Sequence, residues 1–173
     1  EEAKKVQLPL ISGVEFSTTY KKTNVHVLAY SFSLDSVEIQ KLCKFHCHRR
    51  TLRNQMILDL LKMHQMPIDE IELKQSTPAA MIGRPHIALL MMKKGYVRSV
   101  KEAFHLYLGE NKPCYHPGEK VSTEETIEII HRAKGLAIIA HPHLIAETKV
   151  VKSLTEMEFD GLEGYYARFS SLQ

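Results

Sequence analysis

The sequence is poor in cysteine and has no long apolar run. Its three cysteines, Cys43, Cys47 and Cys114, are odd in number and form no disulfide framework, which suits a reducing compartment. No apolar stretch approaches the roughly 20 residues that a membrane-spanning helix needs. We therefore expect a cytoplasmic protein that does not span a membrane.

A strong charge of one sign is also lacking. The formal net charge of +3 permits an anionic substrate but does not require one. The chain has no repeated pattern of basic and aromatic residues, no internal repeat and no low-complexity segment. These absences disfavour a sequence-nonspecific RNA-binding domain.

The composition is that of a globular domain with a sizeable core. Of the 173 residues, 44% are hydrophobic and 25% are charged. Ten histidines are a high number and justify a search for metal ligands. The chain begins at Glu1 rather than at methionine and shows no signal peptide, so we expect residues to be missing from its front.

Strand patterns occupy the two ends of the chain. Residues 10–17 and 25–30 are predicted strands joined by a polar turn, which favours a hairpin in which Glu15 and His26 face each other. A helix capped by Ser122 and Glu125 leads to Gly135, where we expect a left-handed C-cap. A further helix is predicted at about 148–157, and a further strand at 159–166.

Between these flanks the sequence is helical. Apolar spacing predicts helices over 36–64, 67–73, 85–94 and 99–109, the third of them stopped by Gly95. Residues 36–110 therefore form an all-helical inserted subdomain, and residues 1–35 and 111–173 form a discontinuous α/β portion.

The apolar run at 136–140 ends in His141-Pro142. Such a run is typical of a strand buried on both faces, as in a parallel sheet. Proline cannot continue an interior strand, so the His141 imidazole should lie at the strand's carboxyl edge. Active sites of barrels and open α/β sheets occupy this edge.

Glu15, His26 and His141 all lie on predicted strands or at their ends. A carboxylate with two imidazoles suits zinc, manganese or iron, and leaves positions open for water and substrate. A glutamate within an apolar strand is costly unless it is paired or ligated. The alternative is a structural role for each of the three.

Other clusters have weaker patterns. Cys43, His46 and Cys47 share one face of the long helix, where a plain helix surface is favoured over a metal clip. Arg84 and His86 flank a helix start suited to phosphate, or else cap and pair locally.

Glu163, at the end of the last predicted strand, is a candidate neighbour of a metal ligand. The alternative is a salt bridge to Arg168.

Four segments together resemble one family. They are Ile-Ser-Gly-Val-Glu-Phe-Ser (11–17), Val-His-Val-Leu-Ala-Tyr (25–30), Gly-Arg-Pro-His-Ile-Ala (83–88) and Ala-His-Pro (140–142), supported by 95–97, 107–109 and 161–166. The chain resembles the PHP (polymerase and histidinol phosphatase) family of metal-dependent phosphoesterases. The nearest branch dephosphorylates nucleoside 3′,5′-bisphosphates and trims RNA from the 5′ end.

The resemblance implies a distorted (β/α)7 barrel similar to a TIM barrel, with a helical insertion. Glu15, His26 and His141 match metal-ligand positions for a cluster of divalent cations (manganese, iron or zinc), and no catalytic side chain beyond these ligands is implied. Arg84 and His86 match a segment that grips a substrate phosphate. The implied partner is a phosphorylated nucleotide or short RNA, attacked by metal-activated water; no obligate protein partner is evident.

The chain departs from the family pattern at both ends. The His-x-His motif with its aspartate, the histidine of the following strand and the late Asp-x-His are absent, which fits a barrel truncated at both ends. We expect such a piece alone to be inactive. Two alternatives stay open: a degenerate, non-catalytic binding or regulatory module, and a phosphatase for another small phosphate monoester.

Overall fold

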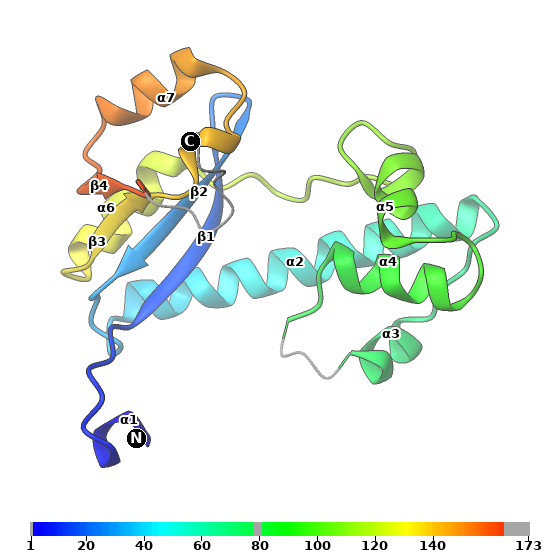
Figure 1. Ribbon diagram of the computed structural model, residues 1–173, viewed down its shortest axis with the longest axis horizontal. Helices are drawn as coiled ribbons and strands as arrows, with labels where there is room; N and C mark the ends of the chain where they lie inside the picture. The colour runs from blue at the N-terminus through cyan, green and yellow to red at the C-terminus, as the bar shows by residue number, and fades with distance from the viewer. Residues whose placement is uncertain (1, 78–80, 165–173) are drawn as a thin grey trace. The chain divides into compact units, whose positions relative to one another are not determined.

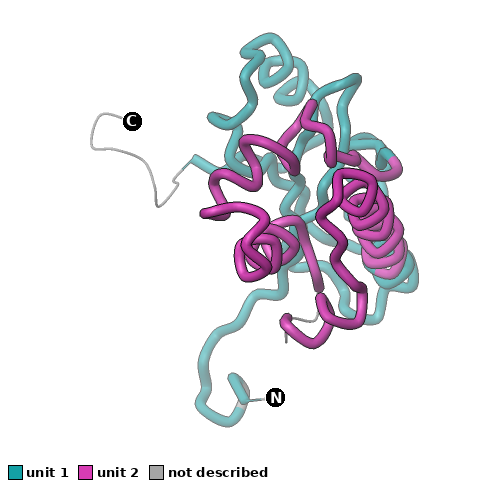
Figure 2. Tube along the Cα trace, turned by 90° about the vertical axis from the view of Figure 1, so that its right-hand side faces the viewer, with its two compact units in different colours: residues 1–43, 120–173 teal, residues 44–119 magenta. Residues whose placement is uncertain are grey.

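The computed structural model describes residues 2–77 and 81–164. It contains two compact units: residues 1–43 with 120–173, and residues 44–119 (Figure 2). We call them the sheet unit and the helical unit. The boundary after Cys43 falls within the long helix α2 (Val37–Met63).

The sheet unit contains a four-stranded sheet in the order β1-β2-β3-β4 (Figure 1). Its strands are β1 (Gly13–Tyr20), β2 (Thr23–Tyr30), β3 (Leu136–Ile139) and β4 (Gly161–Leu162). β1 and β2 form the predicted hairpin, although β1 begins and ends three residues later than the sequence indicated. The chain is therefore a mixed α/β protein.

β3 differs from the strand that the sequence predicted. It pairs antiparallel with β2 and parallel with β4, so only one neighbour fits a parallel sheet. Leu136 is 46% exposed and Ile138 is half-buried, whereas Ala137 and Ile139 are buried. The prediction of burial on both faces was wrong for the described residues, because an uninterrupted apolar run conceals which face meets the core.

One face of the sheet carries the core of the sheet unit. Helix α6 (Thr123–Arg132) packs on β1, β2 and β3, while α7 (Thr148–Thr155) and the first turns of α2 supply further apolar side chains. Alternation along the strands brings Phe16, Val25, Val27, Ala29, Ala137 and Ile139 into this core. The same alternation places Glu15 and His26 on the opposite face.

The helical unit contains the rest of α2, then α3 (Glu70–Ser76), α4 (Arg84–Lys93), α5 (Val100–Ala103) and the π-helix η1 (Phe104–Leu108). Its core includes Ile57, Leu61, Leu73, Ile87, Leu90, Met91 and Leu108. As predicted, Gly95 follows α4 with φ of +76°.

Two helices of this unit depart from the sequence prediction. α3 begins after Asp69, whose carboxylate accepts hydrogen bonds from the Ile71 and Glu72 amides, and not at Pro67. The predicted helix over 99–109 becomes a short α-helix followed by the π-turn, because the Gly109 amide donates to the Phe104 carbonyl five residues earlier.

The glycine after α6 has a different role from the predicted one. Lys134, not Gly135, adopts the left-handed conformation, with φ of +59°. A Cβ on Gly135 would lie 2.9 Å from Phe32 Cβ and 3.1 Å from Ile130 Cγ2. Glycine is needed here for space rather than for backbone freedom.

Three short helices complete the described secondary structure: α1 (Glu2–Lys5), the 3₁₀ helix η2 (Pro142–Leu144) and α7, which ends at Thr155, two residues earlier than predicted. β4 is shorter than the predicted strand over 159–166, whose Tyr165 and Tyr166 lie outside the described residues. None of the described helices combines the length and the apolar character that crossing a membrane requires.

Candidate metal centre

Glu15, His26 and His141 converge on one point of the sheet unit, and we call them the triad. Glu15 Oε1 lies 2.6 Å from His26 Nδ1 and 3.3 Å from His141 Nε2, and the two ring nitrogens are 3.2 Å apart. The imidazole rings meet edge to face at 75°. The structure thus brings together three residues that are separated by up to 126 positions in the sequence.

The strand register explains how Glu15 and His26 meet. Glu15 pairs with Leu28 and Ser17 pairs with His26, so the two side chains are diagonal neighbours on the face away from the core. The Ala140 amide donates to the His26 carbonyl, which fixes the end of β3 beside the middle of β2. His141 follows directly and reaches the same point.

The spacing of the ligand atoms fits a first-row divalent cation. A tetrahedral ion about 2.1 Å from each ligand atom requires those atoms to lie about 3.4 Å apart. The separations of 3.2 Å and 3.3 Å around His141 Nε2 are close to that value, and the 2.6 Å contact requires only a small opening. One carboxylate and two imidazoles are also a donor set that zinc, manganese and iron accept.

The charge state of Glu15 suits a ligand. Burial raises the pKa of its carboxyl, but the hydrogen bond to His141 and the charge of His26 outweigh burial and lower the pKa below its usual value. The carboxylate is therefore ionised near neutral pH, the form in which it binds a cation.

Among the described residues, no other group of three histidine, cysteine or acidic side chains converges in this way. Cys43 is half-buried, Cys47 is exposed and His46 is buried, and no metal clip is found among them. The plain helix surface that the sequence favoured fits Cys47, which is exposed, but was wrong for His46, which is buried.

Arg84 and His86 lie at the start of α4 in the helical unit. His86 Nδ1 accepts a hydrogen bond from the Gly83 amide at 2.9 Å, which caps the helix. Arg84 donates to the Leu108 carbonyl at 3.2 Å, and its guanidinium lies 5.2 Å from the Tyr115 ring centre. Both side chains therefore make the local contacts that were the alternative to phosphate binding.

Besides Arg84, the helical unit contains three arginines that the sequence prediction missed: Arg49, Arg50 and Arg53. Burial, followed by the charges of Arg50, Arg84 and Arg49, lowers the pKa of Arg53 to about 10. Within the described residues, the buried Arg53 Nε has no hydrogen-bond partner. We call Arg49, Arg50, Arg53 and Arg84 the arginine cluster; the i, i+4 spacing of Arg49 and Arg53 on one helix was the available signal.

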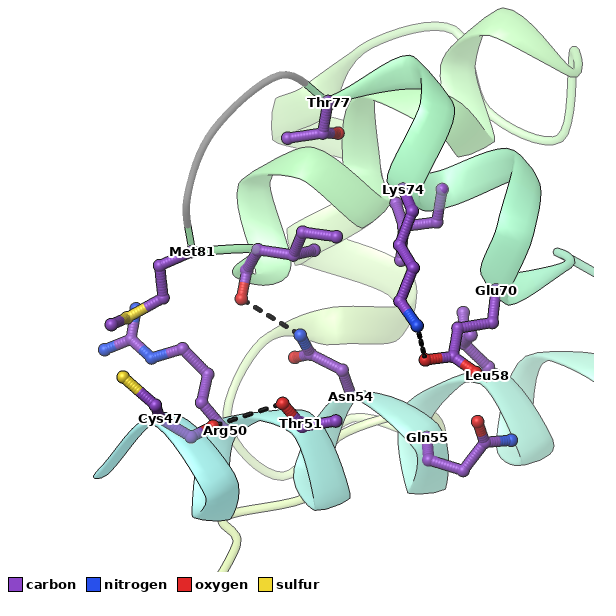
Figure 3. A pocket seen from close by; sticks show the side chains of 12 residues that line it. Cys47, Arg50, Thr51, Asn54, Gln55, Leu58, Glu70, Lys74, Thr77 and Met81 are labelled. Atoms are coloured by element: carbon purple, nitrogen blue, oxygen red, sulfur yellow. Dashed lines mark hydrogen bonds and ion pairs between the residues drawn. The ribbon is translucent and has the colours of Figure 1, made fainter. Parts of the chain in front are cut away.

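A separate pocket of about 310 Å³ lies in the helical unit between α2 and α3 (Figure 3). Two of its polar side chains have partners in the lining: Lys74 pairs with Glu70 at 2.6 Å, and Asn54 donates to the Ile82 carbonyl at 2.9 Å. The lining shows no carboxylate–imidazole grouping. The candidate chemistry therefore lies at the triad and not in this pocket.

Sequence comparison finds relatives of this chain among known proteins. No family model matches the chain. A 5'-3' exoribonuclease of Haemophilus influenzae is 31% identical over 140 residues, covering 81% of this chain and 51% of that protein. The 5'-3' exoribonuclease Rnm of Escherichia coli K12 is 27% identical over 78% of this chain and 46% of its own length. A 3',5'-nucleoside bisphosphate phosphatase of Chromobacterium violaceum is 24% identical over 91% of this chain and 56% of its own length.

The resemblance to PHP-type phosphoesterases is confirmed. Two solved structures share the fold of the chain. A protein described as a metal-dependent phosphoesterase, from Bifidobacterium adolescentis, aligns with a TM-score of 0.79 over 93% of this chain and 59% of that one, at 23% identity. An amidohydrolase from Chromobacterium violaceum, solved with bound sulfate and no metal, aligns with a TM-score of 0.80 over 92% and 58%, at 22% identity.

The chain spans about half the length of the relatives that it matches in sequence.

Proposed function

We propose that this chain forms part of a metal-dependent phosphoesterase that acts on nucleoside 3′,5′-bisphosphates or on the 5′ ends of short RNA. The observation that carries the proposal is the triad, whose three ligand atoms lie within 4.8 Å of one another. The names of the relatives supply the substrate classes.

In this proposal Glu15, His26 and His141 hold a divalent cation. Such a cation lowers the pKa of bound water and stabilises charge that develops on a phosphoryl group. The carboxylate of Glu15 has a second oxygen that can bridge to another cation, so it is the proposed shared ligand of a cluster. Three protein ligands leave coordination positions open for water and substrate.

Arg84 and His86 are proposed to bind a substrate phosphate, together with the arginine cluster. Arginines whose charges repel one another gain when an anion binds among them, since the anion relieves that repulsion. Burial is the main cause of the lowered pKa of Arg53, and the charges of Arg50, Arg84 and Arg49 lower it further, which supports repulsion within the cluster. An acidic substrate is consistent with a basic helical unit, and inorganic phosphate is the simplest probe of it.

We further propose that the sheet unit belongs to a distorted (β/α)7 barrel into which the helical block at 36–110 is inserted. In such a barrel the face that carries the triad would point to the interior. The expected cytoplasmic location and the predicted division at residues 35 and 110 stay predictions.

The test is manganese-dependent phosphate release from a nucleoside 3′,5′-bisphosphate. It uses this chain and any longer natural protein that contains it, each as wild type, Glu15→Ala and Glu158→Ala, an exposed carboxylate that serves as control. We expect release by the longer protein, loss of at least 100-fold in Glu15→Ala and no change in Glu158→Ala. A folded longer protein that is inactive with manganese, iron and zinc would overturn the enzyme proposal and favour the non-catalytic module.

A further inference from the structure

His141 reaches the triad through an unusual backbone turn. Along β3, Ala137 and Ile139 face the core, whereas Leu136 and Ile138 face the other side. Continued alternation would turn His141 towards the core as well, away from Glu15 and His26. Instead, His141 has φ of +30° and ψ of +58°, in the left-handed region that residues with a Cβ rarely adopt.

The Glu163 side chain holds this turn. Its Oε2 accepts a hydrogen bond from the His141 backbone amide at 2.7 Å, immediately beyond the end of β3. The Glu163 amide in turn donates to the Ile139 carbonyl at 2.8 Å. Glu163 thus bridges the last residue of β3 and the turn that follows it.

We propose that Glu163 is a positioning residue for the metal centre, because its carboxylate holds the left-handed turn that places the His141 imidazole beside Glu15 and His26. The inference rests on the proposed metal-binding role of the triad. A hydrogen bond to a ligand's own backbone fixes where the ring stands before the cation arrives. Groups that orient a metal ligand typically change metal affinity 10–100-fold when they are removed.

The structure offers a matched control at the other end of β4. Asp160 Oδ2 accepts the Ala137 amide at 2.7 Å, and the Asp160 amide donates to the Ala137 carbonyl at 2.9 Å. Asp160 and Glu163 therefore each dock β4 on β3 through a carboxylate and a backbone amide, at opposite ends of β4. Only Glu163 contacts a residue of the triad, whereas Asp160 also pairs with His131 of α6 at 2.9 Å. If both residues serve only to dock β4, their loss should have the same consequences.

The experiment measures manganese affinity by titration calorimetry and, without metal, hydrogen exchange of the His141 amide by NMR. The variants of the full chain are Glu163→Ala, Glu163→Gln and Asp160→Ala. We expect Glu163→Ala to lower affinity at least 10-fold and to speed His141 exchange at least 10-fold. Glu163→Gln, whose amide oxygen still accepts the hydrogen bond, should keep most of the wild-type manganese affinity and most of the protection of the His141 amide. Asp160→Ala should change neither the affinity nor the exchange rate by more than about 3-fold.

Equal losses in Glu163→Ala and Asp160→Ala would overturn the inference, because they would indicate general docking of β4. Equal losses in Glu163→Gln and Glu163→Ala would also overturn it, because the charge would then matter and not the hydrogen bond. If Glu163→Ala left manganese affinity unchanged while Glu15→Ala abolished binding, the role of Glu163 would be overturned and the metal site would remain supported. If Glu15→Ala also left affinity unchanged, the metal-binding proposal itself would fail.

Discussion

Acidification should destabilise the helical unit through His46. This histidine is only 9% exposed, and its neighbours along α2 include Arg49 and Arg50. Burial, followed by the charges of these two arginines, lowers the pKa of His46 from 6.5 to about 4. His46 is therefore neutral in the folded protein at pH values at which it would be protonated in the unfolded chain.

The sign and size of the effect follow from this difference. Between pH 6.5 and pH 4 the unfolded chain binds the proton more readily, so the free energy of unfolding decreases as the pH falls and levels off below about pH 4. The complete difference is about 3 kcal/mol, since each pKa unit corresponds to about 1.4 kcal/mol. At pH 5 it has reached about 2 kcal/mol.

The assay is urea unfolding near pH 7 and near pH 5, with wild type, His46→Gln and His48→Gln. His48 is exposed on the same helix and controls for the loss of any histidine. From pH 7 to pH 5, the free energy of unfolding of wild type and of His48→Gln should fall by about 2 kcal/mol more than that of His46→Gln. Equal losses in all three proteins would refute the account of a buried neutral His46 beside the arginine cluster.

Three further predictions test the packing. Ile130→Ala, at a fully buried site, should lower the free energy of unfolding by about 2–5 kcal/mol. Leu144→Ala, at a site that is 61% exposed, should lower it by less than about 1 kcal/mol. Equal losses of the two variants in urea unfolding would contradict the assigned core. Gly109→Ala should lower the melting temperature by several degrees, because the added Cβ would overlap a backbone carbonyl of the π-helix. An unchanged melting temperature would exclude that π-turn. The Thr18 hydroxyl donates to a backbone carbonyl and therefore accepts a hydrogen bond from the Thr123 hydroxyl. Thr123→Val should therefore lower the free energy of unfolding, measured with urea, by about 1–3 kcal/mol. A loss near zero would contradict the buried hydroxyl pair.

Local sequence patterns predicted the hairpin and the long helix well. The polar turn between two β-rich runs indicated β1 and β2, and the predicted helix over 36–64 differs from α2 by one residue at each end. These elements depend on propensity and on short-range spacing, which the sequence states directly. β4 depends on β3 and on side chains at its two ends, so its two residues could not be delimited from the sequence.

The candidate site was predictable as a set of residues but not as a geometry. The likeness to a family of phosphoesterases nominated Glu15, His26 and His141, and the fold then brought them within contact distance. The left-handed turn at His141 was not predictable, because nothing in Ala-His-Pro distinguishes it from an extended chain. The hydrogen bond that the Glu163 carboxylate accepts from the His141 amide depends on the parallel pairing of β3 with β4, a long-range contact that local patterns do not encode.

The role of Gly135 was mistaken for a comparable reason. Glycine after a helix commonly indicates a left-handed cap, yet Lys134 takes that conformation and Gly135 makes room for Phe32 and Ile130. Steric demands from residues distant in the sequence are absent from a local pattern. The same holds for the arginine cluster, since Arg84 joins Arg53 only through the fold.

The most direct test of the central claim is the position of a bound cation. Crystals of the chain grown with manganese should show an anomalous-scattering peak about 2.0–2.3 Å from the Glu15 carboxylate and from the ring nitrogens of His26 and His141. The peak should disappear in Glu15→Ala crystals grown in the same way. A peak at another site, or no peak at millimolar manganese with the triad intact and ordered, would contradict the assignment of these three residues as a metal centre.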